Sequence, residues 1–372
     1  MVALPFTDVN TLSLESNKQV LALPDPAKAI RAPGIDDIIM FSEHHYNTNY
    51  PPFEDFEEME FVHDDGRTVY NITAPTPSGF IAGRDESLDK EVDSKVRIYH
   101  KDGKRWKVLP GTKEFLGQDP FFSYIHGHLI LGNVYIDVDD NDAITGWKTR
   151  FHRGNDVYSL DTEPFFEGPL WMKDIRPHEL PDSNVGVFTR PVNGLYNGGM
   201  IGYLEVPVLE DLTEENLLCA KIFWGFFNER EWGGVNAVYD LDNGLLGVMG
   251  HMARYDEGTV IDGKKAKVYY PFVAAFDWIH QRFITRRELA QGKIDDHNEP
   301  GDVYASFMLY KRDWVDQGDD AKHPILKDVV YPGGYLMQDD KAEAYVSLGD
   351  LKPIRTSGPN VLKPLAELDR AA

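Results

Sequence analysis

The sequence of 372 residues contains one cysteine, Cys219, so no disulfide can form within the chain. Its first residues, MVALPFTDVN, have neither the basic segment nor the long apolar segment of a secretory signal peptide. No uncharged apolar run reaches the roughly 18 residues that a membrane-spanning helix needs. We therefore expect a cytoplasmic protein without a membrane anchor, in which Cys219 is a small buried hydrophobe.

Basic residues are also scarce relative to acidic ones. The chain has 38 Lys and Arg against 61 Asp and Glu, which gives a formal net charge of -23 at pH 7. This charge repels nucleic acid and anionic membrane surfaces, so neither is expected as a partner. A pocket in which a few cations converge can still bind a small molecule that carries phosphate.

Two segments partly resemble metal-binding motifs but lack some of the required ligands. The segment DVDDND (137–142) lacks the glycine of a calcium loop at its sixth position, and Lys148 stands where a bidentate glutamate belongs. His44 and His45 are adjacent, so on a strand they would point to opposite faces. No metal site is expected.

Short apolar or aromatic segments alternate with turns that contain glycine. Such turns predict β-hairpins, because glycine adopts the positive φ that tight turns require. They are Asp102-Gly103, His126-Gly127, Asn193-Gly194 and Asn243-Gly244. One short helix is expected at 211–222, with Thr213 as its N-cap.

Many short strands and few helices predict an antiparallel all-β fold, which is a sandwich, a barrel or a propeller. About five four-stranded blades would use a chain of this length without long irregular loops. No linker rich in proline and serine interrupts the sequence. We expect a single domain, with an N-terminal arm and the start of the first blade at 1–64, a five-bladed β-propeller at 65–352 and a C-terminal tail at 353–372.

Several motifs occur together in a fixed order. They are VYNITAP (69–75), AGRDES (82–87), GQDPFF (117–122), KDIRPHELPDSNVGVFTRPV (173–192), LLGVMGHMARYD (245–256) and DVVYPGGYLMQDDKAEAYVSLGD (328–350). In order and context they resemble the β-mannoside phosphorylases of glycoside hydrolase family 130. The resemblance is closer to the β-1,2-mannosyltransferase/phosphorylases of glycosyltransferase family 108. Either resemblance implies a five-bladed propeller.

The resemblance assigns the role of proton donor to Asp119, which matches the aspartate of the family's Glu-Asp-Pro-Arg segment. Because a residue before proline is pushed out of the α region, we expect an extended backbone at Asp119. The aromatic residues that follow would exclude water from it. The departures are Gln118 in place of the family's glutamate and Phe122, at or next to the position of its arginine. A turn-capping aspartate is the alternative.

The resemblance also implies a phosphate site that is built from cations of different blades. They are Lys173, Arg190 and His251. Where the family has a further lysine, this chain has Glu231 and Trp232, and Arg230 is the nearest cation that could replace it. Taken singly, each cation could equally be a solvated charge at a strand end.

On the sugar side, the positions that hold mannose in the family correspond to Asn71, Arg84 and Asp350. Asp174, a further candidate for substrate binding, follows Lys173, and the two match a charged pair of the family. Asn71 and Asp350 could instead cap turns or loops. Trp232 and Tyr255 are candidates for stacking on a sugar ring, although aromatic residues of a propeller are more often part of its core.

The resemblance therefore implies an inverting β-mannoside phosphorylase or mannosyltransferase that acts on mannose-containing oligosaccharides, with β-1,2-mannooligosaccharides as the expected kind. Phosphate would be the co-substrate, with no other cofactor, and α-mannose-1-phosphate would be the donor in reverse. A sugar-nucleotide donor is compatible with the same cations. The alternatives are a β-mannoside hydrolase on the same propeller, which needs a base for water, and a non-catalytic sugar-binding propeller. A monomer and a homo-oligomer both fit the sequence.

Overall fold

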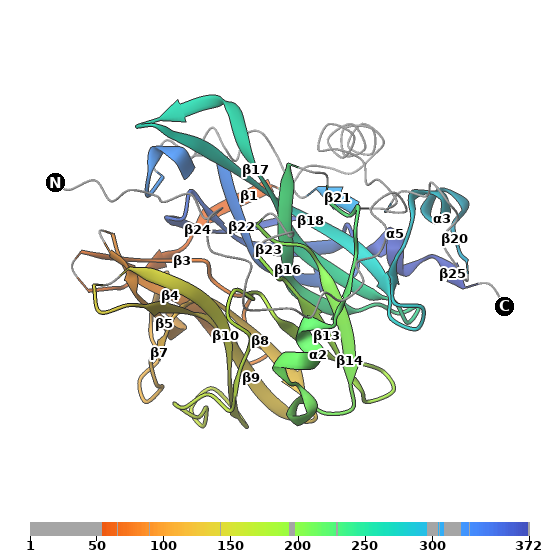
Figure 1. Ribbon diagram of the computed structural model, residues 1–372, viewed down its shortest axis with the longest axis horizontal. Coiled ribbons are helices and arrows are strands. Elements are labelled where there is room, and N and C mark those ends of the chain that lie inside the picture. Colours follow the sequence, from red (N-terminus) through yellow and green to blue (C-terminus); the bar gives the residue numbers. More distant parts are fainter. Residues whose placement is uncertain are drawn as a thin grey trace, which may run out of the picture.

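The computed structural model describes residues 54–64, 66–88, 90–141, 143–192, 198–227, 230–295, 304, 306–308, 321–326 and 328–370. In these ranges strands predominate and helices are short, which confirms the all-β class (Figure 1). None of the helices there is long and apolar enough to cross a membrane. His44, His45 and the turn at Asn193-Gly194 lie outside the described residues.

Three sheets are built from consecutive strands between residues 60 and 222. The first sheet contains β2 (Glu60–Phe61), β3 (Arg67–Tyr70), β4 (Ile81–Ser87), β5 (Lys90–Asp102), β6 (Arg105–Val108) and β7 (Phe115–Leu116). The second contains β8 (Gln118–Ile125), β9 (His128–Val138), β10 (Ile144–Gly154) and β11 (Phe166–Glu167). The third contains β12 (Arg176–Glu179), β13 (Val185–Thr189), β14 (Gly202–Val206) and β15 (Lys221–Ile222).

Eight later strands form a nine-stranded sheet together with β1 (Glu54–Glu58). One part of it contains β16 (Glu231–Asp240), β17 (Leu246–Ile261), β18 (Lys264–Asp277), β19 (Arg282–Phe283) and β21 (Ser306–Met308). The other part contains β22 (Asp328–Gln338), β23 (Lys341–Leu348), β24 (Lys352–Pro359) and β1 (Glu54–Glu58). The two parts join through a short parallel pairing of β18 with β22, at Val268 with Asp328 and Tyr269 with Val329.

The first described strand therefore pairs with one of the last. Strand β1 lies antiparallel to β24, with Glu54 opposite Ser357. The segment 353–372, which we expected to be a tail, contains most of β24 as well as α5 (Lys363–Ala366) and β25 (Asp369–Arg370). Strand β25 pairs in parallel with β20 (Lys293–Ile294).

The predicted turns that fall in the described ranges are confirmed. Gly103, Gly127 and Gly244 have φ values of 63°, 78° and 74°, and they connect β5 to β6, β8 to β9 and β16 to β17. The predicted helix is present but short, as α2 (Glu214–Leu218), and the Thr213 side chain accepts a hydrogen bond from the backbone of Asn216.

The expectation that Cys219 is buried is wrong. Cys219 is the C-cap residue of α2 and is exposed. The helix buries Leu217 in the core instead, and Cys219 follows its last turn, where the side chain reaches the surface.

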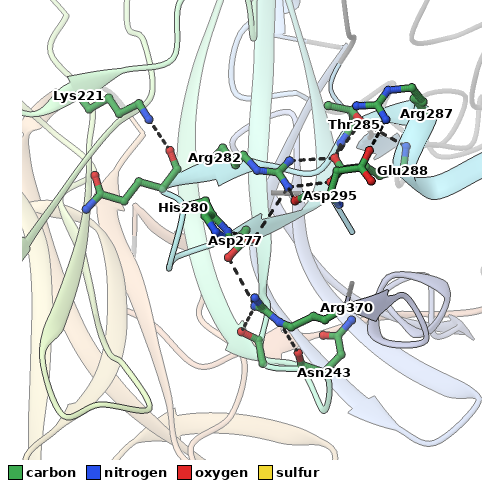
Figure 2. Close-up of polar contacts among 12 residues, drawn as sticks. Lys221, Asn243, Asp277, His280, Arg282, Thr285, Arg287, Glu288, Asp295 and Arg370 are labelled. Atoms are coloured by element: carbon green, nitrogen blue, oxygen red, sulfur yellow. Dashed lines mark hydrogen bonds and ion pairs between the residues drawn. The ribbon is translucent and has the colours of Figure 1, made fainter. Parts of the chain in front are cut away.

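The helix α3 (Arg286–Gln291) is attached to the sheet through a buried carboxylate, Glu288 (Figure 2). Arg282 donates two hydrogen bonds to Glu288, at 2.9 and 2.7 Å. Glu288 also accepts hydrogen bonds from Thr285, the N-cap of α3, and from the backbone of Asp295 at 2.9 Å. Because these partners compensate its charge, the carboxylate can lie in the interior.

Next to this pair, the end of the chain is held by a second buried acid, Asp277 (Figure 2). Asp277 is 2.8 Å from Nδ1 of His280 and 3.5 Å from Nη2 of Arg370. Arg370 also donates hydrogen bonds to the backbone oxygens of Asn243 and Gly244, at 3.1 and 3.0 Å. The C-terminal segment is thereby tied to the turn between β16 and β17.

Replacing Glu288 by alanine should lower the free energy of unfolding by about 3–5 kcal/mol, because Arg282 would lose its main buried partner. Urea denaturation would measure this loss. The matched control is Glu210→Ala, which removes the partner of Arg153 on the surface and should cost at most about 1 kcal/mol. Equal losses in the two variants would contradict the structural role of the buried pair.

Candidate active site

Four of the residues that the sequence selects have an unusual backbone. Asn71, Asp119, Asp174 and Asp350 have φ values of 46°, 52°, 55° and 52°. Positive φ is uncommon outside glycine, although Asn and Asp tolerate it best. Residues held in such conformations cluster at active sites and ligand clamps.

The expected extended backbone at Asp119 is wrong, because its φ is 52°. The register between β8 and β9 shifts between Gln118 and Phe121, so Asp119 lies in an irregularity of the strand. The following proline disfavours the right-handed α region. The irregular strand then places Asp119 in the left-handed region, which turns it out of the regular alternation of side chains.

Among the described residues, the partners of the Asp119 carboxylate contact one of its oxygens, Oδ1. Nδ2 of Asn71 donates a hydrogen bond to Oδ1 at 2.8 Å, and Nη1 of Arg84 lies 3.4 Å from the same oxygen. Within the described part of the chain, Oδ2 receives no hydrogen bond. The backbone nitrogen of Asn71 in turn donates to Oγ of Ser347 at 2.7 Å, which ties the first sheet to β23. One oxygen of Asp119 thus remains available to a ligand.

Arg84 is oriented by the buried carboxylate of Glu86. Glu86 accepts a hydrogen bond from Nε of Arg84 at 2.6 Å and another from the hydroxyl of Tyr70 at 2.8 Å. Its further contacts are with Ser94 and Lys322. Because Glu86 occupies one edge of the guanidinium group, Arg84 directs Nη1 toward Asp119.

A second carboxylate, Asp174, lies between two arginines. It accepts hydrogen bonds from Nη1 of Arg190 at 2.6 Å and from Nη2 of Arg176 at 3.3 Å. All three side chains are buried. Burial alone would raise the pKa of Asp174, but Arg190 and Arg176 outweigh it and lower the pKa below its ordinary value. Asp174 therefore stays ionised and fixes Arg190.

Two glycines make room for Arg190. A Cβ atom on Gly234 would lie 2.6 Å from Cδ of Arg190, and a Cβ atom on Gly199 would lie 2.3 Å from its Nε. Gly199 also has a φ of 138°, which side-chain-bearing residues rarely adopt. The backbone around Arg190 can approach this closely only because both positions are glycine.

His251 is buried beside this pair. Its Nδ1 lies 2.7 Å from Oδ1 of Asn236, and its ring stacks on Tyr269 with a centroid distance of 5.7 Å. Burial, and next the charge of Arg190, lower the pKa of His251 well below its ordinary value. The imidazole is therefore neutral. The orientation of the Asn236 amide decides whether Nε2 accepts or donates a hydrogen bond.

Lys173 and Asp350 complete the group of charged residues around Asp119. Burial, followed by the charge of Arg190, lowers the pKa of Lys173, and Asp119 and Asp174 oppose this shift. Burial raises the pKa of Asp350, and Arg84 opposes the rise. The expected sugar-side and phosphate-side residues thus influence one another's protonation and lie in one site.

The residues at the position of the missing lysine lie on alternate faces of β16. Gly234 faces Arg190, so by strand alternation Trp232 lies on the same face of β16 and Glu231 on the opposite face. Glu231 is buried on that opposite face, and Arg230 is exposed. Trp232 is buried against the rings of Tyr255 and Tyr269, as expected of a core residue rather than of a residue that stacks on a sugar. Tyr255 is exposed.

Several residues of this site were missed in the sequence. Glu86 lies inside a quoted motif, but only its contacts reveal that it holds Arg84. Asn236 and Tyr331 are buried next to His251, with a distance of 6.1 Å between the ring centroids of Tyr331 and His251. Lys322 belongs to none of the motifs. In the described ranges, no group of three His, Cys, Asp or Glu residues could hold a metal ion.

The chain belongs to the family described as "Protein of unknown function (DUF1861)", whose model matches residues 45–294. None of the curated proteins compared matches the sequence.

Its fold is similar to that of MPT-4, a mannose phosphorylase from Leishmania mexicana whose structure is in complex with phosphate ion. The identity is 25% and the TM-score 0.71, over 90% of this chain and 98% of that one. It is also similar to MPT-1, a GDP-Man-dependent mannosyltransferase from the same organism, with 24% identity and a TM-score of 0.69 over 87% and 95% of the chains. A hypothetical protein from Leishmania major has 23% identity and a TM-score of 0.66, over 89% and 100%. These similarities confirm the resemblance to mannosyltransferases and phosphorylases.

Protonation of His251 should destabilise the protein at acidic pH. Because its pKa is lowered on folding, the unfolded chain binds more protons at this residue below about pH 6.5. Its contribution to stability is thus present above that pH and is lost as the pH falls. The difference in free energy of unfolding between wild type and His251→Gln should shrink or reverse between pH 7.5 and 5.5.

Urea denaturation at the two pH values would measure this difference. The matched control is His128→Gln, at an exposed position, measured at the same two pH values. A constant difference for His251→Gln would show that His251 is not held neutral by burial.

Proposed function

We propose that the protein catalyses the inverting phosphorolysis and synthesis of β-mannosides, with β-1,2-mannooligosaccharides as substrates. The observation that carries the proposal is the arrangement around Asp119. This acid has one oxygen free of hydrogen bonds in the described structure, and it shares its site with Lys173 and the pair of Arg190 with Asp174. An acid next to a set of buried cations suits the cleavage of a glycosidic bond by phosphate. The similarity to a mannose phosphorylase favours mannose as the sugar.

In the proposed reaction, an oxygen of phosphate forms a bond to C1 of mannose from the face opposite the leaving group. The bond between C1 and the leaving oxygen breaks, and Asp119 supplies the proton to that oxygen through the 3-hydroxyl of the mannose. The products are α-mannose-1-phosphate and the shortened saccharide. Phosphate is itself an anionic nucleophile, so no second carboxylate is needed to activate water.

Each remaining residue of the site has a proposed task. Arg190, Lys173 and the neutral His251 bind the phosphate, since a guanidinium group matches the geometry of its oxygens. Asn71, Arg84 and Asp350 bind the hydroxyls of the mannose. Asp174 keeps Arg190 in position. The reaction requires no cofactor besides phosphate, and we assign it to the cytoplasm.

We further propose that the chain, essentially over 65–352, is a five-bladed β-propeller. The nine-stranded sheet divides at the short parallel pairing of β18 with β22, which gives five units together with the three other large sheets. One cavity of about 170 Å³ is lined by segments from each of these units. The segments are 73–77, 121–124, 176–178, 236–239 and 333–336. Four of these segments lie in strands and 73–77 lies in the connection from β3 to β4. A central channel to which each blade contributes one segment would have this composition.

The hydrolase is the weaker candidate because of the position of Glu231. This carboxylate would have been the base for water if it projected toward Arg190, but it lies on the other face of β16. Asp174, which does face Arg190, is engaged by two arginines. A carboxylate paired in this way is a poor base.

The proposal is tested by incubating the protein with β-mannobiose isomers, with and without phosphate. Mannose-1-phosphate should form only when phosphate is present. Release of mannose without phosphate would indicate the hydrolase, and no turnover of any isomer would indicate a sugar-binding protein.

Replacing Asp119 by asparagine should lower the rate of phosphorolysis by about 10²- to 10⁴-fold, because general acid catalysis contributes this much and an amide cannot supply the proton. The hydrogen bond from Asn71 to Oδ1 can be retained in this variant. The control is Asp140→Asn, at an exposed position on the turn after β9. Activity of Asp119→Asn within about threefold of wild type would remove Asp119 from the mechanism.

Replacing Arg190 by alanine should raise the KM for phosphate by about 10- to 150-fold, the equivalent of one lost charge-assisted hydrogen bond. The KM for the mannoside should change far less. Initial rates at varied concentrations of each substrate would separate the two effects, with Arg105→Ala as an exposed control. A large rise in the mannoside KM with an unchanged phosphate KM would place Arg190 on the sugar side.

A further inference from the structure

The hairpin of β17 and β18 extends beyond the site that its inner part helps to form. Its tip projects at the upper left of Figure 1, away from the remaining strands. His251 lies in the inner part, and Tyr255 lies four residues further along β17, opposite Lys267 of β18. Side chains two residues apart on a strand share a face, and so do directly opposite partners. His251, Tyr255 and Lys267 therefore lie on the same face of the hairpin.

Tyr255 presents an aromatic ring at the surface with a rigid support behind it. Its side chain is 46% exposed, although its ring centroid lies 4.9 Å from that of the buried Trp232. Trp232 is itself confined, because a Cβ atom on Gly198 would lie 2.9 Å from its Cγ. The ring of Tyr255 is thus supported on one side and accessible on the other, which is the arrangement that stacks on the apolar face of a sugar.

Lys267 lies near both halves of the site. It contributes to the lowered pKa of Lys173, after burial and the charge of Arg190, and it opposes the burial-driven rise in the pKa of Asp350. The backbone gives an independent reason for its closeness to Asp350. Val329 pairs with Tyr269 of β18 and accepts a hydrogen bond from the nitrogen of Gly349 at 2.8 Å.

Asp350, the next residue in the chain, is thus brought beside the end of β18 that carries Lys267. The face that carries Tyr255 and Lys267 adjoins the site between its phosphate-side and sugar-side residues.

We propose that Tyr255 and Lys267 form the subsite for the acceptor sugar. This is the saccharide that leaves in phosphorolysis and receives mannose in synthesis, and the proposal rests on the function proposed above. An uncharged saccharide offers an apolar face of C–H groups to the Tyr255 ring and hydroxyl oxygens to the Lys267 ammonium group. Trp232 then acts as a positioning residue, because it supports Tyr255 without being accessible to the sugar.

The test compares variants of both residues in the direction of synthesis, with α-mannose-1-phosphate as donor and mannose or β-mannobiose as acceptor. Tyr255→Ala should raise the acceptor KM by about 10-fold, the effect of one lost stacking contact. Tyr255→Phe keeps the ring and should change it by less than about 2-fold. Lys267→Met should also raise the acceptor KM. The KM for α-mannose-1-phosphate should stay within about 2-fold of wild type in all three variants.

Val260→Ala is the matched control, because Val260 is exposed on the same hairpin beyond Tyr255 and should affect neither KM. Unchanged acceptor KM values in Tyr255→Ala and Lys267→Met would overturn the proposal. An effect confined to the donor would also overturn it, since these residues would then bind the donor.

Direct binding separates a failure of this subsite from a failure of the proposed reaction. Calorimetric titration of β-mannobiose into Asp119→Asn protein should show weaker binding when Tyr255→Ala is added, and binding of mannose alone should change less. If binding is weakened in this way but the wild-type protein shows no phosphorolysis, the subsite is supported and the proposed reaction is refuted. If wild type shows phosphorolysis but β-mannobiose binds equally to Asp119→Asn protein with and without Tyr255→Ala, the subsite is refuted and the reaction stands. If neither of these two variants binds the sugar, the subsite is also refuted.

Discussion

The position of Asp174 between Arg190 and Arg176 is the interaction on which the candidate site depends. Three buried charges are stable together because both arginines donate hydrogen bonds to the same carboxylate, and removing Asp174 would leave two uncompensated positive charges in the interior. The ion pair of Arg190 with Asp174 also restricts which residues can occupy the neighbouring positions. Gly199 and Gly234 must lack side chains for Arg190 to occupy its place. Burial, and next the charge of Arg190, lower the pKa of His251 and keep it neutral. One ion-pair group thus fixes the geometry, the local sequence and the protonation of the region.

Several polar side chains of the candidate site are held in fixed orientations by neighbouring residues. Glu86 engages one edge of Arg84 and directs its Nη1 toward Asp119, and Asn71 donates a hydrogen bond to one oxygen of Asp119. The positive φ values of Asn71, Asp119, Asp174 and Asp350 serve the same end, because they turn short polar side chains away from the directions that regular strands impose. Such preorganised groups need little rearrangement when a ligand binds, which is how polar sites favour a transition state.

The all-β class and the hairpin turns could be predicted because they depend on local signals, such as the glycines at Gly103 and Gly244. Asp119, Arg190 and His251 were selected by motif resemblance, and their roles in catalysis and phosphate binding stay predictions. The exposure of Cys219 could not be predicted, because it depends on where α2 ends. The conformation of Asp119 depends on a strand irregularity that the proline rule does not include. Lys267 and Lys322 were missed because their neighbours are far away in the sequence, and only the folded chain brings them together.

The pairing of β1 with β24 has a consequence for biosynthesis. Glu54 is among the first described residues to leave the ribosome, whereas its partner Ser357 is among the last. Until β24 has been synthesised, β1 therefore lacks this strand partner. Contacts between such distant parts of a chain form slowly, because a long loop must close before they can contribute. The acidic residues of β1, which are Glu54, Asp55, Glu57 and Glu58, disfavour its pairing with other chains until β24 has been synthesised.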